Sequence, residues 1–376
     1  MKPLRVLYVS PHAHLGGAER VTMDLLEQHD RSVVEPSVCF LHDGPLVGQC
    51  RDRLGLPTYT VNAPPLRNLL QRRRTVHTIA DLIVAGGMDL VHSAMAWGHL
   101  YGGKAARKAG RPAVWFQHVG ASWRSMIEAW ASFVPARTII ANSEFTASGQ
   151  RRVNPRQAKV EVIHPGTRIP AEPRAVRRAR GREALGIASD EFAVGIAARL
   201  QSWKGQDVVI RAAASLCRAR QQARLFIIGD ALFGLEADYA ASLPRLAVEL
   251  GIHERVTFTG FRDDVPDCLA ALDVAIHAST RPEPFGLGLI EAMAAGTALV
   301  AADGGAVREI ATPGVDAILT APADHEALAT ALLALCDDPE RRQSLAAEGA
   351  FTARERFDAV EMTLKVEELY QSLVPR

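Results

Sequence analysis

Short apolar runs rich in β-branched residues recur along the chain, and stretches with apolar residues at three- and four-residue spacing separate them. This alternation is typical of parallel α/β units, in which buried strands are joined by crossover helices. In the first half, strands are predicted near residues 4–10, 36–41, 58–61, 90–93, 113–118, 138–142 and 160–164. In the second half, they are predicted near residues 192–198, 225–229, 256–259, 274–278, 298–301 and 317–319.

The series is interrupted between residues 165 and 191, where two prolines precede an arginine-rich stretch. Such a segment is typical of a linker followed by the first helix of another domain. Because 376 residues also exceed what one hydrophobic core usually organises, we expect two domains. The expected parts are Rossmann-like domains at residues 1–168 and 169–353, facing each other across a cleft, and a C-terminal helix at 354–376 that packs on the first domain.

Composition narrows the class of protein. Hydrophobic residues make up 48% of the chain and charged residues 23%, as in globular domains. No apolar run reaches the roughly 18 residues of a membrane-spanning helix, and the N-terminus shows no signal-peptide core, so we expect a cytoplasmic protein. The five cysteines lack a C-x-x-C pair and are expected to be buried thiols.

Charge is distributed unevenly along the chain. Residues 1–168 carry 21 Lys and Arg against 12 Asp and Glu, whereas residues 169–376 carry 22 against 30. A basic half favours an anionic partner, such as a phosphate-bearing acceptor or a lipid surface. The alternative is that arginine serves only as a solubilising residue.

The first predicted strand is followed by "SPHAHLGGAER", which places Gly16 and Gly17 at the start of a helix. Paired glycines there let backbone N–H groups approach an anion at the positive end of the helix dipole. A plain tight turn is the alternative interpretation. The dinucleotide-binding pattern G-x-G-x-x-G is absent from this turn, which argues against a dehydrogenase.

Arg199 and Lys204 lie on one predicted strand-to-helix loop, "ARLQSWKGQD". Two cations on such a loop can neutralise a diphosphate and stabilise the charge that it develops as a leaving group. Solvent-exposed loop charge is the alternative. Only six of the 43 cations are lysines, so a lysine inside a motif favours the functional interpretation.

The most specific signal is "RPEPFGLGLIEAMAAGTALVAADGGAVRE", in which Glu283 and Glu291 form an E-x7-E arrangement around a predicted helix start near Leu287. Ionised carboxylates accept hydrogen bonds from sugar hydroxyls, and the glycines of "PFGLGL" expose backbone N–H groups. Together with Arg199 and Lys204, these residues predict a site with a phosphate pole and a hydroxyl pole.

The chain resembles the family 4 glycosyltransferases, retaining enzymes of GT-B fold. The resemblance covers nearly the whole chain and rests on the segments "GGAER", "NSEF", "VIHPG", "ARLQSWKGQD", "VTFTGFRDDVPDCLAALDV" and "EPFGLGLIEAMAAGTALVAADGGAVREI". It implies an acceptor-binding first domain and a second domain that binds a nucleotide sugar. Two segments depart from the family pattern, "VIHPG" and "AIHAST", and neither is expected to touch a contact that the resemblance implies.

Roles for individual residues follow from the resemblance alone. Arg199 and Lys204 match the cationic pair that binds the donor diphosphate, Glu283 the carboxylate beside the transferred sugar, and Glu291 the one that holds the ribose. The remaining matches are the backbone of Phe285, Gly286 and Leu287 at the sugar and phosphates, the backbone at Phe261 near the base, and His118 of "WFQHVG" facing the reacting sugar.

The implied reaction transfers a hexosyl group from a UDP- or GDP-linked sugar, with retention of configuration, to a hydroxyl acceptor such as a cell-surface saccharide or its lipid-linked precursor. The departing diphosphate takes the acceptor's proton, so no protein nucleophile is needed. The sequence contains no D-x-D triplet, and we expect no metal and no other cofactor. A nucleotide-sugar epimerase, a phosphorylase and a two-lobed solute-binding protein are the competing interpretations.

The segment "RNLLQRRRTVHTIADLI" predicts an amphipathic helix. It sets Arg67, Arg72, Arg73 and Arg74 beside Leu69, Leu70, Val76 and Ile79, as in a helix that lies on an anionic membrane. An ordinary surface helix with a solvated basic face is the alternative. No nucleic-acid partner is expected.

Overall fold

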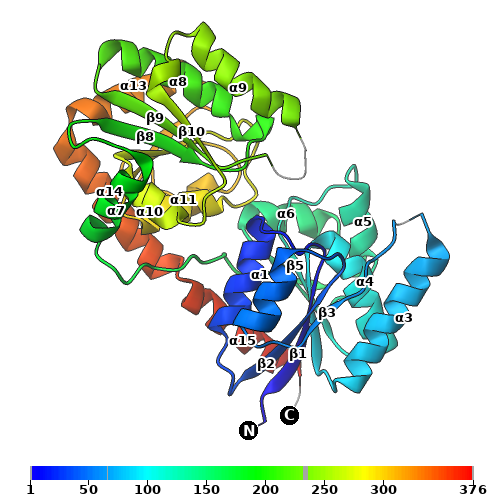
Figure 1. The fold of residues 1–376 in the computed structure, drawn as a ribbon. Helices are drawn as coiled ribbons and strands as arrows, with labels where there is room; N and C mark the ends of the chain where they lie inside the picture. Colours follow the sequence, from blue (N-terminus) through cyan, green and yellow to red (C-terminus); the bar gives the residue numbers. More distant parts are fainter. Residues whose placement is uncertain (1, 66, 232–235, 375–376) are drawn as a thin grey trace. The chain divides into compact units, whose positions relative to one another are not determined.

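The structure, a computed structural model, describes residues 2–65, 67–231 and 236–374. The chain divides into two compact units, each built on one parallel sheet (Figure 1). Unit 1 comprises residues 1–166 and 359–376, and unit 2 comprises residues 167–358. The segment from Ala359 onward therefore belongs to the first unit.

Unit 1 holds a seven-stranded sheet with the order β3-β2-β1-β4-β5-β6-β7. Its strands are β1 (Leu4–Ser10), β2 (Val34–Phe40), β3 (Thr58–Thr60), β4 (Leu90–Ala94), β5 (Ala113–Gln117), β6 (Thr138–Ala141) and β7 (Lys159–Val162). Its helices are α1 (Gly17–Gln28), α2 (Pro45–Gly48), the π-helical turn η1 (Gln49–Arg53), α3 (Leu69–Ala85), α4 (Met95–Lys108), α5 (Met126–Ser132), α6 (Glu144–Arg152) and α15 (Ala359–Leu373).

Helices cover both faces of this sheet because its strands are apolar on both sides. On one face, Leu7 and Val9 of β1 belong to a core that includes Ile79 of α3 and Tyr101 of α4. The alternate residue Tyr8 points to the opposite face, where its hydroxyl meets Tyr370 of α15. The C-terminal helix thus completes the second layer of unit 1.

Unit 2 holds a six-stranded sheet with the order β10-β9-β8-β11-β12-β13. Its strands are β8 (Phe192–Ala197), β9 (Ala223–Ile228), β10 (Val256–Gly260), β11 (Val274–His277), β12 (Ala298–Ala302) and β13 (Ile318–Thr320). Its helices are α7 (Arg174–Leu185), α8 (Gln206–Ala219), α9 (Ala237–Glu249), α10 (Val265–Ala271), α11 (Leu287–Ala294), α12 (Val307–Ile310), α13 (His325–Asp337) and α14 (Pro339–Arg356), with 3-10 turns η2 (Ser202–Lys204) and η3 (His253–Arg255).

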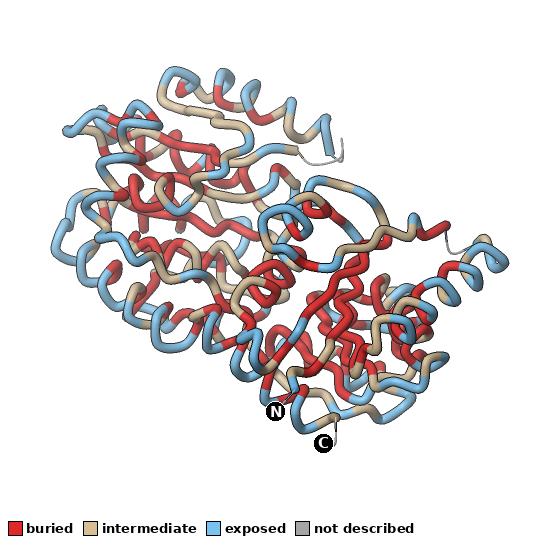
Figure 2. The backbone as a smooth tube through the Cα atoms, turned by 60° about the horizontal axis from the view of Figure 1, so that its bottom comes forward, coloured by how far each residue is buried: buried red, intermediate tan, exposed pale blue. Residues whose placement is uncertain are grey.

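Two apolar layers sandwich the sheet of unit 2. Residues from α8, α9, α13 and α14 pack on one face. Residues from α7, α10, α11 and the end of α14 pack on the other. Figure 2 shows the central strands of both units as buried segments enclosed by partly exposed helices. This burial on both faces explains why the strands read as continuous apolar runs.

All thirteen predicted strands overlap an observed strand. The continuous helix predicted from residue 354 is not observed, because α14 ends at Arg356 and α15 begins at Ala359. Phe357 between them is buried against Phe285 of unit 2, and its carbonyl accepts a hydrogen bond from Thr167 N at 2.8 Å. The chain passes from one unit to the other at this break.

Candidate active site

The predicted phosphate and hydroxyl poles lie at the switch point of the unit 2 sheet. Strand order reverses between β8 and β11, which are hydrogen-bonded neighbours. Loops at the carboxyl ends of such strands diverge and leave room for a ligand. The loop after β8 carries Arg199 and Lys204, and the loop after β11 carries Glu283. The topology therefore brings together residues that are about 80 positions apart in sequence.

Backbone contacts hold these two loops together. Thr280 N donates to Trp203 O at 2.8 Å. Gly205 has a φ of 73°, and a Cβ there would lie 2.1 Å from Ala278 O. Only glycine permits this close approach of the two loops.

Glu283 is buried, with 6% of its surface exposed, and three donors reach its Oε2 atom. Lys204 Nζ lies 2.8 Å from this oxygen, Ser279 Oγ 2.7 Å and His277 Nε2 3.0 Å. Within the described part of the chain, no donor contacts Oε1. One carboxylate oxygen is therefore saturated, while the other is left to accept a hydrogen bond.

Electrostatics keep this carboxyl ionised. Burial alone would raise the pKa of Glu283, but the hydrogen bond from His277 and the charge of Lys204 outweigh it and hold the pKa well below its usual range. Burial lowers the pKa of the Lys204 ammonium, and Glu283 opposes this effect. The charge of Arg199 further lowers the Lys204 pKa, and the charge of Glu291 raises it. Lys204 Nζ further lies 3.9 Å from the centre of the Trp203 ring.

The turn that leads into α11 and the loop after β12 fix the backbone around Glu283. Gly286 caps the helix with a φ of 107°, and α11 begins at Leu287, as predicted. Phe285 is buried against Phe357. Gly305 also adopts a left-handed conformation, and a Cβ there would lie 2.2 Å from Glu283 O. The backbone of Glu283 is thus enclosed by the loop after β12.

Phe261 follows β10, which lies two strands from the switch point. Its ring is 56% exposed. It lies in the same unit as Glu283 and Lys204, after the carboxyl end of its own strand. The structure shows no contact between its ring and those two residues.

Unit 1 carries the other predicted site residues. His118 directly follows β5, stacks on Phe116 with ring centroids 4.4 Å apart, and is buried. Burial lowers its pKa to about 3, so the imidazole is neutral. Its Nε2 atom is buried and has no hydrogen-bond partner within the described residues. A neutral ring with an unsatisfied nitrogen can bind a polar ligand group.

Gly16 and Gly17 do lie at a helix start, since Gly16 is the N-cap of α1. A Cβ on Gly16 would lie 2.6 Å from Glu19 Oε2, so a carboxylate of the helix itself approaches this turn. A larger residue at position 16 would clash with the Glu19 carboxylate.

Two side chains that contact Glu283 escaped sequence reasoning. The "AIHAST" departure was expected to leave the site untouched, and this expectation is wrong, because His277 and Ser279 both bond to Glu283. The signal that could have found them is the presence of polar residues at the end of an apolar strand, six and four positions before the first glutamate.

The amphipathic helix predicted to lie on a membrane is present as α3, but some of its apolar residues lie in the protein core and others at the surface. Ile79 is fully buried in the core, and Val76 packs against that core. Leu69 and Leu70 are 57% and 73% exposed. Arg67 precedes the helix. The pKa of Lys104 on α4 is lowered mainly by burial and also by the positive charge of Arg72.

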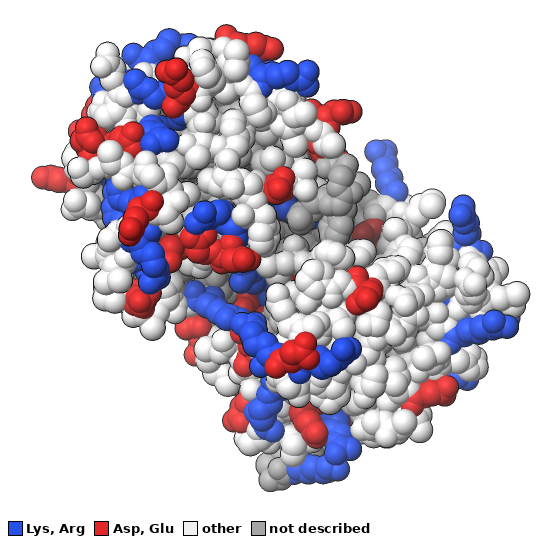
Figure 3. All heavy atoms as spheres, viewed as in Figure 1, with Lys and Arg blue, Asp and Glu red and all other residues white. Residues whose placement is uncertain are grey.

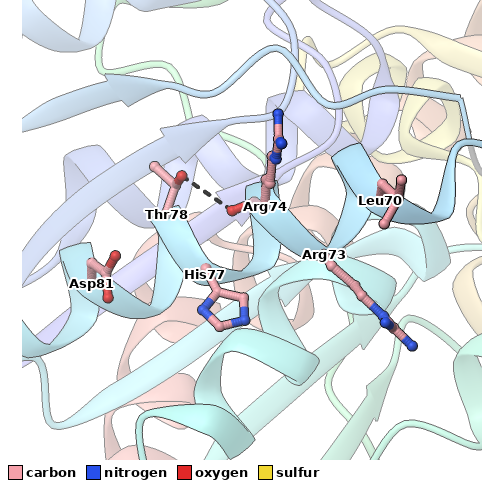
Figure 4. A pocket seen from close by; sticks show the side chains of 6 residues that line it. All are labelled: Leu70, Arg73, Arg74, His77, Thr78 and Asp81. Carbon is pink, nitrogen blue, oxygen red and sulfur yellow. Dashed lines mark hydrogen bonds between the residues drawn. The ribbon is translucent and has the colours of Figure 1, made fainter.

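A shallow hollow lies along the exposed face of α3, with Arg73 and Arg74 pointing in different directions (Figure 4). It is lined by Leu70, Arg73, Arg74, His77, Thr78 and Asp81. On the face shown in Figure 3, cationic and anionic side chains alternate over both units without forming one continuous basic area.

Three further observations concern the described part of the chain. None of its helices is both long and apolar enough to cross a bilayer. No group of three or more His, Cys, Asp or Glu side chains there is arranged to hold a metal ion. All five cysteines are free thiols; four are buried and Cys336 is half-buried.

Comparison with known proteins identifies the family. The family described as "Glycosyltransferase Family 4" matches residues 15–169, and "Glycosyl transferases group 1" matches residues 178–350. The D-inositol 3-phosphate glycosyltransferase 1 of Catenulispora acidiphila is 30% identical over 318 residues, which cover 79% of this chain and 75% of that protein. The lipopolysaccharide core biosynthesis mannosyltransferase LpsB of Rhizobium meliloti is 29% identical over 199 residues, or 52% of this chain and 56% of LpsB.

Solved structures agree with this result. Anabaena HepE, crystallised in complex with UDP and glucose, has a TM-score of 0.86 and 28% identity, with 98% of this chain and all of that chain covered. WaaG, a glycosyltransferase of lipopolysaccharide biosynthesis, shares the fold with a TM-score of 0.72 and 17% identity over 97% and 99% of the two chains. The fold is therefore GT-B, and the chain belongs to glycosyltransferase family 4. It is a glycosyltransferase, as the sequence motifs predicted.

Proposed function

We propose that this protein transfers a hexosyl group from a UDP- or GDP-linked sugar to a hydroxyl acceptor, with retention of anomeric configuration and without a metal ion. The observation that carries the proposal is the arrangement at Glu283. Its Oε2 atom is held by Lys204, His277 and Ser279, so its Oε1 atom can accept a hydrogen bond from a sugar hydroxyl. Lys204 pairs with this carboxylate and lies on the same loop as Arg199, and the two supply the cations for a diphosphate.

The chemistry assigned to these residues is electrostatic. The bond between the anomeric carbon and the diphosphate oxygen breaks, the acceptor oxygen bonds to the same face of that carbon, and the acceptor's proton passes to the departing phosphate. Arg199, Lys204 and the N–H groups after Gly286 stabilise the charge that develops on the leaving group. Because these groups are positively charged or polarised toward the phosphate, the proposal needs no divalent cation.

Other residues have supporting parts in the proposal. Glu291 binds the ribose, the backbone at Phe261 contacts the base, and the backbone of Phe285 to Leu287 contacts the sugar and phosphates. His118 is neutral and has an unsatisfied Nε2, so it can hydrogen-bond a hydroxyl of the reacting sugar. The binding of UDP and UDP-glucose by the structural neighbour HepE supports the UDP form of the donor.

We further infer that the enzyme acts in the cytoplasm, peripherally at an anionic membrane, on a cell-surface saccharide or its lipid-linked precursor. Support comes from the start of α3, where Arg73 and Arg74 lie beside the exposed Leu69 and Leu70. Names of relatives such as LpsB, a lipopolysaccharide core mannosyltransferase, are consistent with this class of acceptor.

The test is the melting temperature of the purified protein with UDP, GDP, ADP and their sugar conjugates, with and without EDTA, since a ligand of the native state raises it. We expect a rise for one nucleotide that survives EDTA and disappears in Arg199→Ala and Lys204→Ala, but persists in the exposed control Arg218→Ala. NMR of the product of the selected donor then reports the anomeric configuration. No nucleotide-dependent shift, or inversion at the anomeric carbon, would contradict the proposal.

A further inference from the structure

His277 and Ser279 hydrogen-bond to Glu283, but the reaction proposed above gives neither of them a contact with a substrate. We infer that they are positioning residues that select for a hydroxyl on the donor sugar. They fix Oε2 of Glu283 so that Oε1 alone faces the ligand. The inference rests on the proposed function, in which Glu283 binds the transferred sugar.

The geometry shows why two further donors matter beside Lys204. His277 is the last residue of β11, Ser279 lies in the loop that follows, and Lys204 comes from the loop after β8. The three donors approach Oε2 from three backbone positions, at 3.0, 2.7 and 2.8 Å. A carboxylate oxygen has about two lone-pair sites, so Oε2 has no capacity left for a ligand. Rotation of the carboxylate would break all three bonds at once.

The histidine ring is buried, and its Nε2 faces the carboxylate. His277 is 8% exposed, and its Nε2 must carry the proton that it donates to Glu283. Its Nδ1 is buried and has no partner within the described residues. The hydrogen bond to the carboxylate therefore fixes Nε2 as a donor of this ring.

Without these two donors, Lys204 could bind both carboxylate oxygens, as an ammonium with three donors allows. Oε1 would then be shared between the ammonium and the sugar. With them in place, Oε1 remains an acceptor only, and the group that pairs with it must be a donor such as a hydroxyl. A sugar that lacks this hydroxyl would leave a buried carboxylate oxygen unsatisfied, which is a strong basis for rejection.

The experiment compares the affinity for a nucleoside diphosphate with that for its sugar conjugate, using UDP against UDP-glucose and GDP against GDP-mannose. The variants are His277→Phe, which keeps a planar ring without a donor, and His277→Gln, whose amide can donate near the position of Nε2. Ser279→Ala provides a smaller change should the ring substitutions disturb folding. Calorimetry gives the dissociation constants, and release of free sugar by slow transfer to water gives the rate without an acceptor.

For His277→Phe and Ser279→Ala, we expect the affinity for the sugar conjugate and the rate of sugar release to fall about 10-fold or more. Affinity for the free nucleoside diphosphate should stay within about twofold, and His277→Gln should recover most of the loss. Equal losses for the diphosphate and its conjugate, or no loss, would overturn the inference. If the wild-type protein bound neither the diphosphates nor their sugar conjugates, the proposed function would fail together with the inference.

Discussion

The hydroxyl groups of Tyr8 and Tyr370 lie 2.7 Å apart, although 362 positions separate them in the chain. They belong to a buried series of hydrogen bonds in unit 1. His92 Nδ1 lies 2.5 Å from the Tyr370 hydroxyl, and His29 Nε2 lies 2.6 Å from the Tyr8 hydroxyl. His29 Nδ1 lies 2.8 Å from Glu367 Oε1. With neutral histidines, each group from His92 to His29 donates to the next, and His29 donates to Glu367.

These bonds attach α15 to the sheet of unit 1, so their loss should destabilise that unit. Tyr370→Phe removes the partner of His92 Nδ1 and one of the two partners of the Tyr8 hydroxyl, which keeps its hydrogen bond to His29. We expect a loss of about 1–3 kcal/mol in the free energy of unfolding. Urea unfolding measures it. Tyr59→Phe is the control, because that half-exposed hydroxyl has no hydrogen-bond partner within the described residues, and its removal should cost little. Equal losses of unfolding free energy in the two variants would show that the Tyr370 hydrogen bonds do not stabilise unit 1.

Unit 1 should also lose stability in acid because of its buried histidines. Burial lowers the pKa of His99 from 6.5 to about 4. Between pH 6.5 and 4 the unfolded chain takes up a proton that the folded unit does not, so stability falls as pH falls, by about 1.4 kcal/mol per pH unit for this residue. His99→Gln should reduce the pH dependence of urea unfolding by one proton in this window. An unchanged slope would show that His99 is not responsible.

The sequence predicted the two sheets because their strands are buried on both faces and therefore read as apolar runs. It also placed Lys204 and Glu283 at strand ends, and parallel topology brings such ends together. The break at Phe357 was missed, since residues 354–373 keep a helical spacing throughout. Helix α14 ends there because Phe357 accepts a hydrogen bond from Thr167 and packs on Phe285, and both are tertiary contacts.

The hydrogen bonds to Glu283 could not be predicted from the sequence either, because they too are tertiary contacts. The sequence places His277 at the end of a predicted strand, and its partner Glu283 lies beyond the turn that follows, so the pattern did not predict their contact. The hydrogen bonds of Tyr370 were invisible for a different reason, since they join the two ends of the chain. Local patterns report which residues are apolar or charged, whereas these contacts depend on how distant segments meet.

Gly305 should be essential for the shape of the donor site. It has a φ of 68°, and a Cβ would lie 2.2 Å from Glu283 O and 2.5 Å from Glu283 N. Gly305→Ala should therefore displace Glu283 and lower the affinity for the sugar conjugate about 10-fold or more, besides a strain of about 1–3 kcal/mol. Gly314→Ala is the matched control, because φ there is 73° but the nearest atom is an Arg341 nitrogen at 3.8 Å. Calorimetry should show normal affinity in the control and reduced affinity in Gly305→Ala.

The ion pair between Lys204 and Glu283 should stabilise unit 2 above acid pH. Removing one charge of a buried pair leaves the other uncompensated, and Glu283→Gln should cost about 3 kcal/mol at pH 7. The pKa of Glu283 is depressed in the folded unit, so its contribution is complete above the unfolded pKa and is lost as pH falls through the folded pKa. The difference in unfolding free energy between wild type and Glu283→Gln should thus shrink below about pH 4. A difference that does not change with pH would contradict this account.

The arginines at the start of α3 should decide whether the protein binds anionic membranes. Each cation near such a surface contributes about 1 kcal/mol, so changing Arg72, Arg73 and Arg74 together to glutamine should weaken binding roughly 100-fold. Sedimentation with liposomes containing phosphatidylglycerol measures this binding, and raised salt should weaken it in the wild type. The matched control changes three exposed arginines of unit 2, Arg211, Arg218 and Arg245, to glutamine and should sediment like wild type. If the α3 variant also sedimented unchanged, membrane contact through this helix would be excluded, and its basic face would be an ordinary solvated surface.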